Sequence, residues 1–156
     1  MAKSSKDFDV YVTGLNEVLR AFRALPKEAA GELRTSSVEI AEKYMVPAWR
    51  EAALGAGPWG PKIADSVKAK RDRIPAVTIG GNKKVFSGGA SATMVRYPSD
   101  KGDRARAAKG ATNRMPAAFR SGTDWISQAR RGYASEAIVE WGHAVDRIVK
   151  KWDVTP

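Results

Sequence analysis

The sequence predicts an α+β protein in which a small antiparallel sheet is covered by a long, kinked N-terminal amphipathic helix and by a C-terminal helix. Apolar residues recur about every 3.6 positions over 29–52 and again over 134–152, as they do in amphipathic helices. Between these segments, residues 63–97 hold short runs of alternating apolar and polar residues, separated by Gly and Asn. A small sheet of this kind needs helices over one face and partners at its edges.

The N-terminal quarter contains one predicted strand and one predicted helix. Residues 1–8 are polar, and we expect them to be flexible. The run at 9–14 (Asp-Val-Tyr-Val-Thr-Gly) predicts a short strand that ends at its glycine. Helical spacing of apolar residues predicts a helix over 15–25, and Pro26 suits the first turn of the next helix. We expect a single α+β domain over 9–156.

The long helix predicted over 29–52 is interrupted by a proline. Pro47 lacks the backbone N–H that a helix interior needs, so we expect a kink near Met45. Glycines and prolines crowd into 55–61, which predicts a loop. Trp59 within it could pack back on the core or serve as an exposed docking residue at a subunit interface.

Residues 63–97 predict the sheet. A short helix is expected over 63–70, stopped by Pro75. The β-branched run at 76–79 predicts a strand, and Gly-Gly-Asn-Lys-Lys at 80–84 predicts a turn. Alternation over 90–97 predicts a further strand.

The C-terminal third begins with a long basic loop, predicted at about 98–122, that has no periodicity. Loops of this length are usually functional or disordered. This one either stays disordered until it binds a partner or is a solvated tether. Thr123 or Asp124 can cap a helix from Trp125 to about Gly132.

The last helix, over 134–152, has a continuous apolar stripe that includes two tryptophans. Its acids come early and its bases late, as the helix dipole favours. The stripe either closes the core of the monomer or packs partly on a neighbouring subunit. The candidate subunit-interface residues are Trp59, Trp141 and Trp152.

All of the net charge of +10 lies in one segment. Residues 62–122 contain fourteen Lys and Arg against four Asp and Glu, whereas the residues on either side sum to zero. Such an asymmetry indicates a surface that meets nucleic acid or an acidic protein ring. The residues expected to face DNA or such a partner are Lys68, Lys70, Arg71, Arg73, Lys83, Lys84, Lys101, Arg104, Arg106, Lys109 and Arg114.

The sequence offers no convincing catalytic, metal or cofactor site. There is no cysteine, and a single histidine, His143, cannot build a histidine-based metal site. Asp65 and Asp72 stand among bases, where solvation explains them better than two-metal catalysis. The glycines at 80–84 lack the Walker spacing of a phosphate-binding loop. We therefore expect no enzyme.

Composition also bounds the location and the mode of any nucleic-acid binding. No apolar run approaches the ~20 residues that span a bilayer, and the first residues do not resemble a signal peptide. We therefore expect the chain to be made in the cytoplasm and not to associate with a membrane. The basic segment lacks interleaved aromatic residues and helix-turn-helix or zinc-finger spacing. Non-specific contact with the DNA backbone remains open.

Several segments resemble the neck, or tail-completion, proteins of long-tailed bacteriophages. The likeness starts with a strand leading into Thr-Gly-Leu and with the helix pattern at 14–26 (Gly-Leu-Asn-Glu-Val-Leu-Arg-Ala-Phe-Arg-Ala-Leu-Pro). It continues through a long helix and through Asp-Ser-Val-Lys-Ala at 65–69, and it spans most of 8–152. The basic loop departs from the commoner pattern. The segments similar to versions from phages of actinobacteria are 77–89, 125–130 and 141–145.

This resemblance implies a structural protein of the virion with no cofactor. Proteins of that family form a ring in the neck, join the DNA-filled head to the tail and line the DNA passage. The implied partners are other copies of the chain, as a hexamer rather than a dodecamer, the adjacent head-connector or stopper and tail-terminator proteins, and the backbone of packaged DNA. The alternative is a non-specific DNA-binding protein that uses the basic region 62–122.

Overall fold

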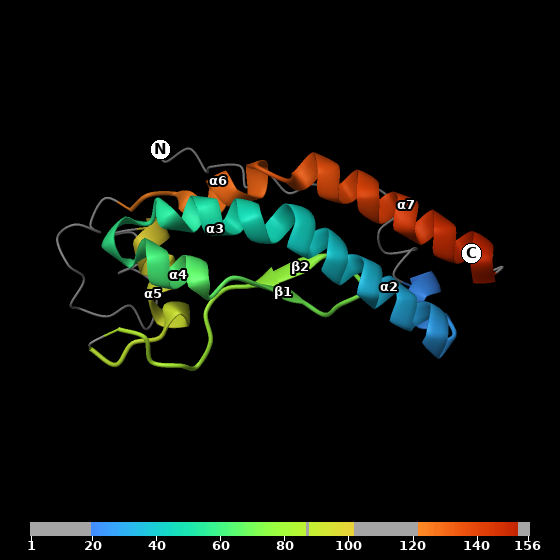
Figure 1. The fold of residues 1–156 in the computed structure, drawn as a ribbon, viewed down its shortest axis with the longest axis horizontal. Coiled ribbons are helices and arrows are strands. Elements are labelled where there is room, and N and C mark those ends of the chain that lie inside the picture. The colour runs from blue at the N-terminus through green and yellow to red at the C-terminus, as the bar shows by residue number, and fades with distance from the viewer. Residues whose placement is uncertain (1–19, 87, 102–121, 153–156) are drawn as a thin grey trace, which may run out of the picture.

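A helical segment from Lys27 to Leu54 runs through the molecule and organises the rest (Figure 1). The computed structural model describes residues 20–86, 88–101 and 122–152. The segment consists of α2 (Lys27–Ile40), a π-helical turn (Ala41–Met45) and α3 (Val46–Leu54). It is flanked on one side by α7 (Ala134–Trp152) and on the other by a β-hairpin, both of which contact the π-helical turn.

The interruption predicted near Met45 is confirmed. Regular α-helix stops at Ile40 and resumes at Val46, and the π-helical turn occupies the residues between. Pro47 lies in the first turn of α3, where its missing N–H would otherwise have bonded to a carbonyl of the preceding turn. A π-helical turn accommodates that loss without ending the helix.

The glycine- and proline-rich stretch after α3 is not the loop that was predicted. A 3₁₀ turn (Gly57–Trp59) leads directly into α4 (Gly60–Asp65). Each of these elements has a proline in its first turn, where the missing N–H has no role in the helix. The short helix predicted over 63–70 therefore begins and ends earlier than expected, and its last residues form a strand.

The sheet consists of β1 (Lys68–Lys70) and β2 (Ala76–Thr78), which pair antiparallel. The register places Ala69 opposite Val77, and both side chains pack against the main core. The covered antiparallel sheet is thus confirmed, but it has two strands among the described residues.

The strand predicted over 90–97 is wrong, because this segment belongs to α5 (Ala92–Lys101). Thr93 and Val95 suggested a strand, but Ala92, Val95 and Ser99 lie at helical spacing and are buried on one face. An isolated bridge between Lys84 and Ser91 is the strand-like pairing that remains there. Consequently the basic loop cannot begin at position 98, since 98–101 are helical.

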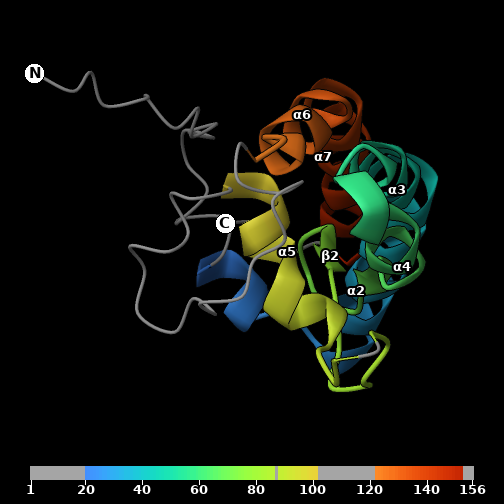
Figure 2. The same cartoon turned by 90° about the vertical axis from the view of Figure 1, so that its left-hand side faces the viewer.

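The two C-terminal helices agree closely with prediction. α6 covers Trp125–Arg131 and α7 covers Ala134–Trp152. Figure 1 shows them following one another along the molecule, with α6 against α3 and α7 running back along α2, and Figure 2 looks along this row from the α6 end. The predicted flexible segment at 1–8, the predicted strand at 9–14 and residues 15–19 of the helix predicted over 15–25 lie outside the described residues. Residues 20–23 are helical.

The apolar side chains form two clusters joined by one tryptophan. In the larger cluster, Trp49 of α3 meets Trp125 of α6 edge-on, with ring centroids 5.9 Å apart. The smaller cluster holds Phe22, Leu33 of α2 and Ile148 of α7. Trp141 of α7 packs against both clusters. Among the helices that the structure describes, none is long and apolar enough to cross a bilayer.

We predict that Gly80→Ala destabilises the fold by about 2 kcal/mol. Gly80 has φ of 98°, and an added Cβ would lie 2.5 Å from the backbone nitrogen of Thr93 in α5. The neighbouring Gly81→Ala is the matched control, because nothing lies within 4 Å of its added Cβ. Urea unfolding of both variants measures the difference; equal stability would contradict the prediction.

Candidate partner surface

The hairpin and the loop after it carry several exposed cations. Lys68 and Lys70 of β1 point outward, whereas Ala69 between them faces the core. Arg71 is exposed at the tip of the hairpin, and Arg73 is half-buried. Lys83 and Lys84 are exposed in the following loop, and Lys101 is half-buried at the end of α5. The other predicted partner-facing cations lie outside the described residues: Arg104, Arg106, Lys109 and Arg114.

Asp72 is a local partner for these cations rather than part of an acidic pair. Its Oδ2 lies 3.1 Å from Nζ of Lys70, and its Oδ1 accepts a 2.8 Å hydrogen bond from the backbone N–H of Arg73. These contacts, the backbone hydrogen bond foremost, lower the pKa of Asp72, so it is ionised at neutral pH. Asp65 is exposed on α4. Among the described residues no group of His, Asp and Glu is arranged to hold a metal ion.

An open cleft of about 490 Å³ lies between β2 and α5. Arg96 of α5 spans it by donating from Nη1 to the carbonyl oxygen of Ile79, at 3.2 Å. At the start of α5, Oγ1 of Thr93 accepts a 2.8 Å hydrogen bond from the backbone N–H of Gly81. The residues that line the cleft are Trp49, Lys70, Val77, Thr78, Ile79, Gly80, Gly81, Thr93 and Arg96.

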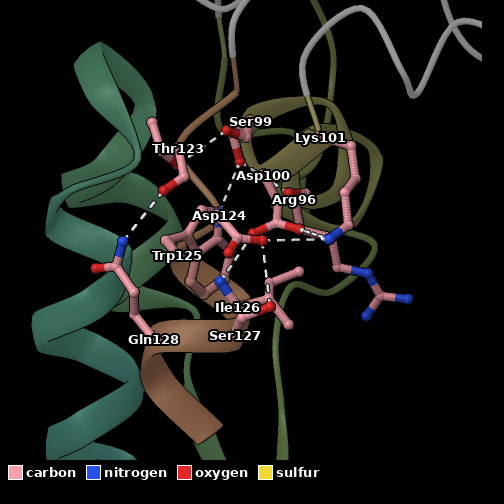
Figure 3. Close-up of polar contacts among 10 residues, drawn as sticks. All are labelled: Arg96, Ser99, Asp100, Lys101, Thr123, Asp124, Trp125, Ile126, Ser127 and Gln128. Atoms are coloured by element: carbon pink, nitrogen blue, oxygen red, sulfur yellow. Dashed lines mark hydrogen bonds and ion pairs between the residues drawn. The ribbon is translucent and has the colours of Figure 1, made fainter. Parts of the chain in front are cut away.

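A cluster centred on Asp100, which we call the Asp100 clasp, joins the end of α5 to the start of α6 (Figure 3). The carbonyl oxygen of Asp100 accepts hydrogen bonds from the backbone N–H groups of Thr123 (3.1 Å) and Asp124 (3.0 Å). Its fully buried side chain accepts a 2.8 Å bond from the N–H of Ile126 through Oδ1. Oδ2 lies 3.0 Å from Nζ of Lys101, as an ion pair rather than a directional hydrogen bond.

Ser99 extends the clasp into the core. Its Oγ accepts a 3.0 Å hydrogen bond from Nε1 of Trp125 and donates to the carbonyl oxygen of Arg96 at 2.8 Å. Its own carbonyl oxygen accepts from Oγ1 of Thr123 at 3.0 Å. The clasp therefore joins the end of α5 to residues 123–126, which lie on either side of most of the predicted basic loop (Figure 3).

The expected cap of α6 is supplied by another element. Asp124 precedes the helix with a left-handed φ of 53° and makes no side-chain hydrogen bond to the backbone of the first turn. Instead Asp100, distant in sequence, accepts the N–H of Ile126 and places a carboxylate at the helix start. Helix spacing and turn chemistry give no signal for such a long-range cap, so sequence reasoning missed Asp100.

The three candidate interface tryptophans all make contacts within this chain. Trp59 is half-buried and packs against Phe86, with ring centroids 5.8 Å apart. Trp141 donates from Nε1 to the carbonyl oxygen of Arg73 at 3.1 Å. Trp152 donates to Oε2 of Glu32 at 3.5 Å. Each retains only part of its surface for a partner, and His143 is exposed on α7.

Comparison of the chain with protein-family models, with curated proteins and with solved structures found no match.

Proposed function

We propose that this chain is a structural protein of a bacteriophage virion, without catalytic activity of its own. In this proposal it forms a homo-oligomeric ring in the neck, joins the DNA-filled head to the tail and lines the DNA passage. A hexamer is favoured over a dodecamer. Its partners are its own copies, the head-connector or stopper and tail-terminator proteins, and packaged DNA.

The observation that carries the proposal is the resemblance of its segments, in order, to neck proteins. Two features support it. A small sheet has edges that closure into a ring would cover. The excess of ten positive charges lies in residues 62–122, as expected for a surface that meets DNA or an acidic ring.

We predict that reversing the charges of Arg104, Arg106 and Lys109 together blocks the joining of heads to tails. Long-range attraction to an acidic surface depends on the sum of these charges, so the triple variant should reduce infectious titre by orders of magnitude. Plaque assays and electron microscopy, which should show separate heads and tails, measure the effect.

The matched control reverses three exposed bases outside the basic segment: Arg20, Arg23 and Lys27. These changes alter net charge equally and should leave titre near the wild-type value. Full titre from the Arg104, Arg106 and Lys109 variant would contradict the prediction. A map of the virion neck that lacks this chain would overturn the proposed function itself.

A second candidate function is non-specific DNA binding through the basic region. The exposed positions of Lys68, Lys70, Lys83 and Lys84 favour it. If these lysines neutralised four DNA phosphates, the logarithm of the binding constant would fall linearly with the logarithm of the salt concentration, with a slope of about −0.9 per phosphate contact. Salt-dependent binding of a random duplex by the isolated chain, with the chain missing from virions, would favour this alternative.

A further inference from the structure

The first two-thirds of α7 present an acidic and apolar outer face. Residues 134–146 contain three acids and no Lys or Arg, in a chain with a net charge of +10. Ile138 and Val139 are 38 % and 56 % exposed there, and they are two of the four exposed large apolar side chains in the described part of the chain. Of the acids, Glu136 and Asp146 are exposed, and Glu140 accepts a hydrogen bond from Tyr44.

A glycine lies beside these residues in the helix interior. Gly142 follows Ile138 by one helical turn, and an added Cβ would meet nothing within 4 Å. Glycine in the interior of a helix is less stable than alanine, because it loses more backbone freedom on folding. Packing within the described part of the chain does not require it, whereas close approach by another polypeptide would.

The cleft between β2 and α5 is complementary to that face. It is concave and has apolar walls at Val77 and Ile79. Lys70 and Arg96 supply positive charge, and no acidic residue is among the lining residues. The carboxylate of Asp72 lies 3.1 Å from Nζ of Lys70 and partly offsets the positive charge of this lysine. An apolar cleft with so modest a positive charge fits a protein surface better than a nucleic-acid backbone.

Two complementary surfaces at different places on one chain produce a head-to-tail contact between copies. Figure 1 shows α7 and β2 on opposite sides of the helical segment from α2 to α3. We propose that the α7 face, defined by Glu136, Ile138, Val139 and Gly142, docks in the β2–α5 cleft of a second copy. The inference rests on the proposed ring, and it names the surfaces that would join neighbouring subunits.

We predict that Val139→Lys weakens self-association at least about ten-fold, because it places an ammonium group in the centre of the contact, against a cleft that already holds Lys70 and Arg96. Leu54→Lys is the matched control. Leu54 is 57 % exposed on α3, against 56 % for Val139, and it lies outside both surfaces. Its variant should associate within about two-fold of wild type. Sedimentation velocity up to millimolar concentration measures both, with circular dichroism as a check of folding.

A cross-linking experiment identifies the occupant. Because the chain has no cysteine, a tagged Thr78→Cys protein and an untagged Val139→Cys protein can be mixed and treated with a bismaleimide. We expect a tagged–untagged heterodimer that is several-fold more abundant than with untagged Leu54→Cys. Homodimers of Val139→Cys alone would indicate a symmetric contact and overturn the inference, as would a protein that stays monomeric and uncross-linked.

Further experiments distinguish this contact between copies from a DNA-binding site in the cleft and from a failure of the proposed neck function. If Lys70→Glu abolishes binding of a short DNA duplex and leaves self-association unchanged, the cleft is a DNA site and the inference fails. A neck map that lacks the chain would refute the proposed function and leave the solution contact standing. A neck ring built with Val139→Lys at full occupancy would refute the contact alone.

Discussion

Asp100→Ala is expected to destabilise the fold by about 3 kcal/mol, a large part of the ~5–15 kcal/mol typical of a domain. The side chain of Asp100 is fully buried and accepts the N–H of Ile126 at the start of α6. Alanine leaves that donor without its acceptor, removes a negative charge from the helix N-terminus and leaves Lys101 without its closest carboxylate. Urea or thermal unfolding, monitored by circular dichroism, measures the loss.

Asp100→Asn separates the hydrogen bond from the charge. Asparagine can keep an oxygen opposite the N–H of Ile126, so the loss should fall to about 1–2 kcal/mol. An exposed carboxylate on α4, Asp65, provides the control, since Asp65→Ala should stay within about 0.5 kcal/mol of wild type. If Asp100→Ala were as stable as the Asp65 variant, the clasp would have no structural role.

The pH dependence of this effect follows from Lys101. Its pKa is raised above 10.5, mainly by the side-chain contact with Asp100. A raised folded-state pKa means that the ion pair stabilises fully below the ordinary lysine pKa and is lost as pH rises through the folded value. The difference between wild type and Asp100→Asn should thus be constant from about pH 6 to 9 and shrink only at strongly alkaline pH.

Long periodic elements were the part of this fold that the sequence could predict. α7 was expected over 134–152 and is found there, because its apolar stripe repeats over several turns. The interruption near Met45 was predictable for a different reason, since Pro47 removes a specific backbone donor. In both places a local rule suffices, and tertiary contacts reinforce it.

The conformation of the short elements depends instead on contacts with other parts of the chain. Residues 90–97 alternate over too few positions to distinguish a strand from a helix, and α5 forms because Val95 and Ser99 are buried together on one helical face. Lys68–Lys70 have weak strand propensity, yet pairing with β2 makes them a strand.

In the candidate partner surface, too, some features could be predicted from the sequence and others depend on tertiary contacts. Charge counting located the basic segment at 62–122, because composition is a property of sequence alone. The Asp100 clasp and the β2–α5 cleft arise from contacts between residues far apart in the chain, such as the bond from Trp125 Nε1 to Ser99 Oγ. No local pattern encodes those distances, so they could be found only in the fold.

Trp125→Ala is expected to cost about 3–5 kcal/mol, the range for deleting a large aromatic side chain from a core. Trp125 is 1 % exposed and lies edge-on to Trp49. Its replacement opens a cavity between α3 and α6, which pack against each other. Chemical unfolding should show the largest loss of any single substitution proposed for the chain.

Two phenylalanine variants separate packing from hydrogen bonding at this tryptophan pair. Trp125→Phe removes the N–H that donates to Ser99 and leaves that oxygen without its donor. Trp49→Phe removes an N–H that has no hydrogen-bond partner in the described part of the chain. Since both lose similar ring area, Trp125→Phe should be less stable than Trp49→Phe by about 1 kcal/mol. Equal losses would mean that the Ser99 bond adds nothing, and that packing alone ties α6 to the clasp.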